Sequence, residues 1–143
     1  MTANGSPRDA LVDFKVNVKL KLAALWAATM FCYVYGDLFR LMQPGKLSAM
    51  LAGRTPLGPV TPDLLLGFAI FMSGPAFMVS FSAALPARIN RWSNVILGGA
   101  YTLAILATMP GAWSFYLYLG LVEALLTATI AWLAWTWPKV PYP

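Results

Sequence analysis

The sequence predicts an all-α protein, a membrane-embedded four-helix bundle with both termini in the cytoplasm. Of its residues, 59% are hydrophobic and 10% are charged, whereas a soluble domain carries about 25% charged residues. The apolar residues gather in four runs, each close to the roughly 20 helical residues that cross the hydrocarbon core. A chain of this composition is expected to have lipid, rather than water, around most of its surface.

Proline or Pro-Gly ends each apolar run, as expected where helices stop. The second run also has a start signal: Thr61 can cap the helix, Pro62 suits the first helical position, and Asp63 faces the positive end of the helix dipole. Asp63 is therefore interpreted as structural. The predicted helices cover about residues 22–42, 63–85, 92–109 and 113–137 of a single membrane domain, residues 22–137.

The segments outside these helices are short. Residues 1–21 are predicted to form a basic juxtamembrane segment that lies on anionic lipid. Within it, residues 14–21 alternate apolar and polar as a strand does, but such a strand would have no partner. Residues 47–52, between the first two helices, could form one short interfacial helix, and residues 138–143 form a C-terminal tail.

Lysine and arginine set the predicted orientation through the positive-inside rule. The side with both termini and the second connection holds seven of them, whereas the other side holds Lys46 and Arg54, with Arg40 counted as intramembrane. The seven are Arg8, Lys15, Lys19, Lys21, Arg88, Arg91 and Lys139. The polar N-terminus has no secretory signal, so the first helix is expected to remain as an anchor in a multi-pass protein of the inner (cytoplasmic) membrane.

Several classes of function are disfavoured by the residues that the sequence lacks. It has no histidine, which is the commonest metal and haem ligand and the usual general base near neutral pH. It has no phosphate-cradling glycine loop and no nucleophile beside a plausible base. The net charge of +5 is scattered at the ends of apolar runs, so nucleic acid is not a predicted partner. No metal, cofactor or catalytic residue is predicted, and an enzyme would have to use carboxylate, tyrosine and arginine alone.

Small residues are predicted to make the helix–helix contacts, because helices in lipid associate through close packing. Pro75 should kink the second helix and free a backbone carbonyl near mid-membrane, where a cavity could open. The predicted contact residues are Ala69, Ser73, Ala76, Ser80 and Ala83 on the second helix, Gly98 and Gly99 on the third, and Gly120, Ala124, Ala128 and Ala131 on the fourth.

Three ionisable residues fall inside the apolar runs, where they are functional candidates because a charge in lipid is costly. Asp37 and Arg40 lie near the outer end of the first helix, where they suit either a local ion pair or a site. Glu123 lies about 15 Å beyond Trp113 at 1.5 Å per residue. It is interpreted as a protonated glutamate hydrogen-bonded across helices, as a ligand- or proton-handling group, or as a contact with another subunit.

Other polar residues are expected at the depth of Glu123. Together they predict a polar layer inside the bundle, and a vertical chain of Arg40, Asp37 and Glu123 is a further interpretation. The candidates for this ligand or proton site are Glu123, Asp37, Arg40, Tyr33, Ser73, Tyr101, Thr102 and Thr127.

A family resemblance lies in three stretches, KVNVKLKLAALWAATMFCYVYGDLFRLMQPG, LPARINRWSNVILGG and FYLYLGLVEALLTATIAWLAWTWP. They are similar to an uncharacterised bacterial family of four-helix integral membrane proteins, a domain of unknown function that resembles DoxX-like proteins in architecture. The resemblance covers roughly residues 14–138 and implies the four-helix fold and a bacterial source, but no activity. The matching polar signature positions are Asp37, Asn90, Arg91, Trp92, Asn94 and Glu123.

The third helix opens with Asn90, Arg91, Trp92 and Asn94, which suit either capping and anchoring or the binding of a lipid head group or partner. The predicted function is non-catalytic binding of a hydrophobic or lipid-like ligand within the bundle. One alternative is an accessory or assembly subunit of a larger membrane complex. Another is a dimeric proton-coupled small-molecule transporter. The predicted partners are therefore the lipid bilayer, a hydrophobic small molecule, and either further copies of the chain or the subunits of a complex.

Overall fold

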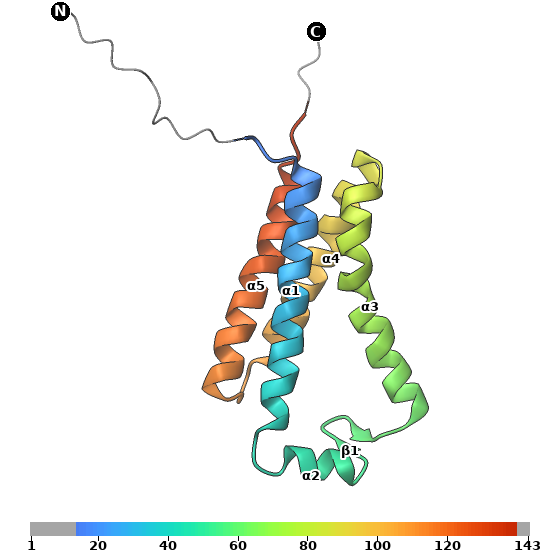
Figure 1. Ribbon diagram of the computed structural model, residues 1–143, viewed down its shortest axis with the longest axis vertical. Helices are drawn as coiled ribbons and strands as arrows, with labels where there is room; N and C mark the ends of the chain where they lie inside the picture. Colours follow the sequence, from blue (N-terminus) through green and yellow to red (C-terminus); the bar gives the residue numbers. More distant parts are fainter. Residues whose placement is uncertain (1–13, 140–143) are drawn as a thin grey trace, which may run out of the picture.

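The computed structural model describes residues 14–139. Within them, four long helices stand side by side, and a short helix with a two-stranded hairpin connects two of these helices at one end (Figure 1). The elements are α1 (Val18–Leu41), α2 (Lys46–Leu51), β1 (Arg54–Thr55), β2 (Gly58–Pro59), α3 (Pro62–Ala84), α4 (Ala87–Thr108) and α5 (Ser114–Trp135). The start of α1 and the end of α5 lie at the same end of the molecule, opposite α2 (Figure 1).

Two helices begin earlier than the sequence predicts. α1 starts at Val18 because the side chain of Asn17 caps it, accepting the backbone N–H of Lys19 at 2.9 Å. The predicted juxtamembrane segment therefore ends inside a helix, and its residues 1–13, like residues 140–143 of the tail, lie outside the described residues. α4 starts at Ala87 after Pro86. The prediction that Asn90 caps this helix is wrong, because Asn90 lies inside it.

The core draws on all four long helices. Its buried apolar cluster comprises Leu22 and Trp26 of α1, Met78 of α3, Tyr101 of α4 and Ile130 of α5. The backbones of α4 and α5 approach each other closely at Gly98. A Cβ added there would lie 2.9 Å from the Thr127 carbonyl oxygen and 3.0 Å from the Ala131 backbone nitrogen. The predicted close contact at Gly98 is thus confirmed, whereas Gly99 has open space around it.

The small-residue stripe predicted on α3 does not make that helix's main contacts. Ala69, Ala76, Ser80 and Ala83 are exposed, and the buried residues of α3 are Pro75, Met78 and Ser82. The two sets are offset by one or two positions, which is 100° or 200° of rotation on a helix. The large Met78 therefore fills the core, while Ala76 and Ser80 face a hollow described below.

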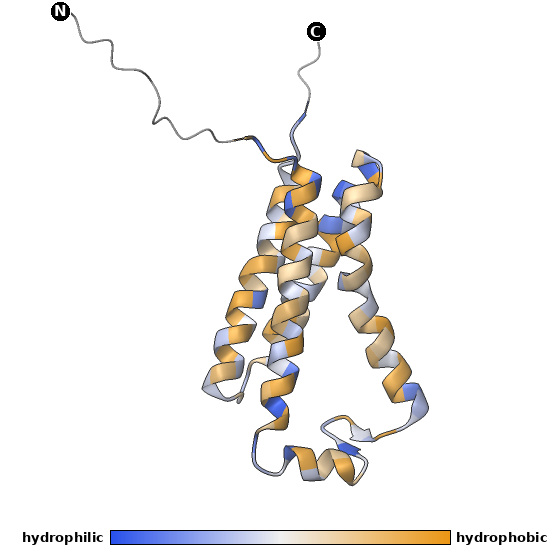
Figure 2. Cartoon of the chain, in the orientation of Figure 1, coloured by the Kyte–Doolittle hydropathy of each residue, from blue (hydrophilic) through white to orange (hydrophobic). Residues whose placement is uncertain are grey.

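Much of the outer surface is apolar, with large side chains such as Phe31, Ile70 and Leu125 more than half exposed. Hydrophobic residues occur along most of the length of the helices (Figure 2). Within the described residues, α1, α3 and α5 are each long and apolar enough to cross a membrane. The mean hydropathy of α4 is lower because its first two turns contain Arg88, Asn90, Arg91 and Asn94.

Candidate functional site

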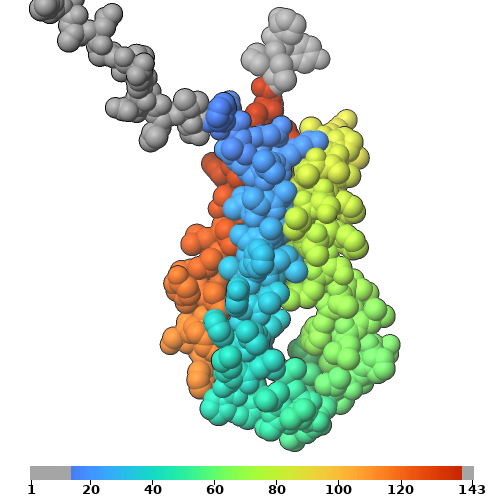
Figure 3. Space-filling view, viewed as in Figure 1, coloured from blue at the N-terminus to red at the C-terminus, as the bar shows by residue number. Residues whose placement is uncertain are grey.

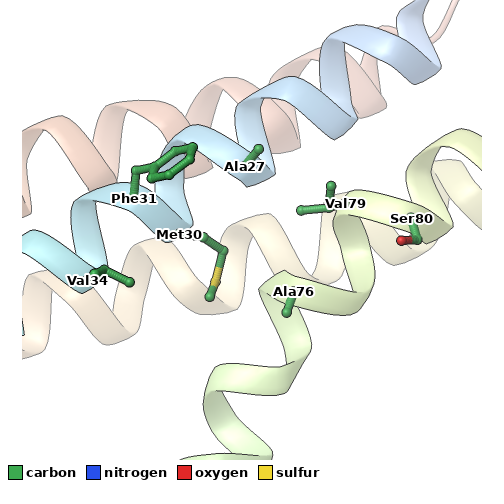
Figure 4. Close-up of a pocket in the computed structure, with 7 residues that line it drawn as sticks. All are labelled: Ala27, Met30, Phe31, Val34, Ala76, Val79 and Ser80. Carbon is green, nitrogen blue, oxygen red and sulfur yellow. The ribbon is translucent and has the colours of Figure 1, made fainter.

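An apolar cleft of about 350 Å³ lies between α1 and α3. Ser80 supplies the one hydroxyl of its lining, and side chains from both helices face the gap (Figure 4). Toward α2 the two helices diverge, and the molecule is hollowed between them (Figure 3). The lining residues are Ala27, Met30, Phe31 and Val34 of α1 with Ala76, Val79 and Ser80 of α3.

Pro75, which lies inside α3, directly precedes the cleft-lining residue Ala76. Proline has no backbone N–H, so the carbonyl of Phe71 loses its partner within the helix. The Tyr101 hydroxyl of α4 donates to that carbonyl instead. Gly74 makes this possible, because a Cβ at that position would overlap the Tyr101 hydroxyl. The freed carbonyl near Pro75 follows from the sequence, but its partner Tyr101 was predicted to face Glu123.

Glu123 of α5 lies on the other side of α1. Its side chain is 7% exposed, and its carboxylate accepts no hydrogen bond from the residues that the structure describes. It faces Gly36, where an added Cβ would lie 3.8 Å from the Glu123 Oε1 atom. Tyr33 and Asp37 lie close enough for Coulombic interaction with Glu123. The Tyr33 hydroxyl is itself buried and lacks a hydrogen-bond partner among the described residues.

Arg40 and Asp37 occupy the last turns of α1 beside this group. The Arg40 guanidinium lies over the ring of Tyr116, 5.2 Å from its centroid. Asp37 is exposed and within Coulombic range of Arg40 and of Glu123. The vertical chain of Arg40, Asp37 and Glu123 stays a prediction, and the Arg40 guanidinium is engaged by the ring of Tyr116 on α5.

The other hydroxyl-bearing members of the predicted polar layer do not bond the carboxylate of Glu123. Thr127 bonds Thr102 across α4 and α5 at 2.7 Å and also donates to the backbone carbonyl of Glu123 at 2.9 Å. Ser73 donates to the Ala69 carbonyl of its own helix. Serine and threonine hydroxyls in helices commonly donate a hydrogen bond to the backbone carbonyl one turn earlier in the same helix. The predicted layer thus separates into three parts. These are Glu123 with Tyr33, the hydrogen-bonded pair of Thr102 and Thr127, and Tyr101, which bonds the Phe71 carbonyl.

A buried amide network joins α1, α3 and α4 toward the other end of the helices. Asn94 accepts the Trp26 indole N–H at 2.7 Å and the Ser82 hydroxyl at 3.2 Å. Its Nδ2 donates to the Asn90 Oδ1 at 2.6 Å, and Asn90 donates to the Ser82 carbonyl at 2.6 Å. All four side chains are 0% exposed. These bonds hold three helices together through groups that lipid could not solvate.

The predicted head-group role for Asn90 and Asn94 is therefore wrong for these two residues, because their amides face inward and bond to the protein. Sequence reasoning missed Trp26 and Ser82 as their partners. A signal was present in Trp26, whose indole N–H lies inside an apolar run and needs an acceptor.

Arg91 and Trp92 lie outside the amide network. Arg91 donates to the Trp135 carbonyl at 3.1 Å, and its guanidinium packs over the rings of Trp92 and Trp135. A cation at this carbonyl stabilises the C-terminal end of α5. Trp92 is 47% exposed, so of the four predicted head-group residues it points outward most clearly.

No group of three or more potential metal ligands occurs within residues 14–139. Searches among curated proteins and among solved structures find no match to the chain. A family model, described as a family of unknown function (DUF6326), matches residues 10–141. The chain belongs to this family.

Proposed function

We propose that this chain is a multi-pass protein of the bacterial inner membrane, with α1, α3, α4 and α5 all crossing the bilayer and both termini in the cytoplasm. The 22 residues of α4 give a length of about 33 Å, enough for the hydrocarbon core. Its amides Asn90 and Asn94 are buried, whereas Ile96 and Leu103 are among its exposed apolar residues. The basic residues near the start of α1 and the end of α5 favour a cytoplasmic location for that end.

We further propose that the protein binds a hydrophobic or lipid-like molecule in the cleft between α1 and α3, without catalysing a reaction. The observation that supports this most is the apolar cleft beside Pro75. Its volume of about 350 Å³ falls in the range of small-molecule sites, roughly 300–1,000 Å³. In the bilayer, lipid chains reach the open side of the cleft, so a ligand enters sideways and is selected by shape more than by hydrophobicity.

The test is native mass spectrometry of the full chain released from membranes in mild detergent. Ala76→Phe places a ring on the exposed wall of the cleft without entering the core. Ala84→Phe is the matched control, because Ala84 is also exposed on α3 but does not line the cleft. We expect wild type and Ala84→Phe to retain an apolar molecule that Ala76→Phe lacks. Equal retention by all three would refute the cleft as the binding site.

A second candidate site is Glu123, favoured by its buried carboxylate without a hydrogen-bond partner in the described chain. Such a group is costly in lipid unless it binds a proton or a ligand, as in a proton-coupled transporter. Glu123→Gln in the same experiment separates the two sites. Loss of the molecule in Glu123→Gln with retention in Ala76→Phe would move the site to the α1–α5 boundary. A ligand-free chain that appears only with other subunits would favour an accessory protein.

A further inference from the structure

A second cavity, of about 520 Å³, lies where α1 begins and α5 ends. This is the end of the molecule opposite α2 (Figure 1). Its lining differs from that of the α1–α3 cleft, because it combines ammonium groups with aromatic and apolar side chains. The residues that matter here are Lys15, Lys19, Lys21, Thr136 and Trp137.

Positive charge at this end is not balanced by any described carboxylate. Among residues 14–139 the acidic side chains are Asp37, Asp63 and Glu123. Asp37 and Asp63 lie toward the α2 end, and Glu123 lies in the middle of α5. The described basic residues at the cavity end are Lys15, Lys19, Lys21, Arg88, Arg91 and Lys139.

The local structure holds part of this charge in place. The Lys19 ammonium donates to the Leu85 carbonyl at 2.7 Å, which ties the first turn of α1 to the end of α3. Lys15 and Lys21 are exposed and line the cavity from either side of the helix start. The positive end of the dipole of this 24-residue helix adds to the same field.

We propose that this cavity binds the phosphate group of a phosphate ester, through charge-assisted hydrogen bonds from the ammonium groups of Lys15 and Lys21. Phosphate oxygens are strong acceptors for such donors. Leu133 and Trp137 supply an apolar wall beside the phosphate. The ester can come from a membrane phospholipid or from a soluble compound. The proposal does not depend on a ligand in the α1–α3 cleft.

The test is binding of phosphatidylglycerol to the full chain in a neutral detergent, measured by native mass spectrometry. Diacylglycerol with the same acyl chains is the comparison, because it lacks the phosphate. Lys15→Gln/Lys21→Gln removes two charges at the cavity. Lys46→Gln/Arg54→Gln removes two charges at the α2 end and is the matched control.

We expect wild type to bind phosphatidylglycerol in preference to diacylglycerol, and Lys15→Gln/Lys21→Gln to bind it roughly 30-fold more weakly. The control should bind within about twofold of wild type, since its substitutions lie far from the cavity. Displacement by millimolar inorganic phosphate would assign the site to soluble phosphates, and resistance would assign it to the lipid head group. Equal weakening in both double variants, or equal binding of diacylglycerol, would overturn the proposal.

Discussion

At the scale of single residues, Asn94 makes more connections than any side chain around it. One amide accepts from Trp26 and Ser82 and donates to Asn90, so it links α1, α3 and α4. Each of these groups is 0% exposed. Removing one partner from a buried network leaves the others without hydrogen bonds, which costs more than an average hydrogen bond contributes.

We expect Asn94→Leu to lower the free energy of unfolding by about 1–3 kcal/mol. The reason is that the Trp26 indole N–H and the Ser82 hydroxyl would lose their hydrogen-bond acceptor. Reversible unfolding in mixed micelles, followed by circular dichroism, measures this change. Thr129→Val is the control: Thr129 is exposed and bonds only the Leu125 carbonyl of its own helix, so its effect should be below about 0.5 kcal/mol. Equal losses in the two variants would contradict the role given to Asn94.

Residue type predicts which side chains are costly to bury in a membrane, but not which residues they contact. Glu123 was identified because a carboxylate in an apolar run is costly, and it is indeed buried. Its depth alone also suggested Ser73 and Tyr101 as neighbours, yet these residues bond to Ala69 and Phe71. Depth along a helix follows from residue number, whereas the direction of each side chain depends on how the helices are rotated against one another.

At the scale of elements, the apolar runs indicate where helices lie but not where they begin. α1 and α4 start several residues before their apolar runs, since Asn17 and Pro86 determine the starts. Helix α3 shows the same limit for packing. Its small residues follow a helical spacing, but Met78 and Ser82 take the core face and leave Ala76 beside the cleft. A stripe of alanines therefore indicates only that the side chains on that face are small. Such a face can line a cleft as well as pack against another helix.

The α4–α5 contact offers a matched pair of adjacent glycines. Gly98→Ala would push a Cβ against the backbone of α5, whereas Gly99→Ala meets nothing within 4 Å. We expect Gly98→Ala to lower the free energy of unfolding by about 1–3 kcal/mol through overpacking. Gly99→Ala should leave it unchanged or raise it by up to about 1 kcal/mol, because alanine favours the helix. The same unfolding assay measures both, and a similar loss in the two variants would rule out the close approach at Gly98.

At the scale of the whole molecule, two hollows lie at different depths of one helical framework. The α1–α3 cleft is lined almost entirely by apolar side chains, and the basic cavity lies where the described chain begins and ends. The sequence predicted a helical protein with a kink at Pro75 where a cavity could open. It could not predict the basic cavity, because Lys15 and Trp137 lie at opposite ends of the sequence and meet only through the folding of the chain.

The proposed topology requires that α4 crosses the membrane, although its mean hydropathy is lowered by residues that the fold buries or places at its end. The most direct test is labelling of single cysteines by a membrane-impermeant maleimide in spheroplasts, in a Cys32→Ala background. The positions are Ser48 in α2, Ser114 at the start of α5, and Lys139 after α5, each exposed and each substituted by cysteine. Ser48→Cys is the outer reference.

With four crossings, Ser48→Cys and Ser114→Cys should both react in intact spheroplasts, and Lys139→Cys should react only after lysis. If α4 does not cross the membrane, position 114 lies inside and position 139 lies outside. Lys139→Cys would then react from outside while Ser114→Cys is protected, which would contradict the four-crossing arrangement.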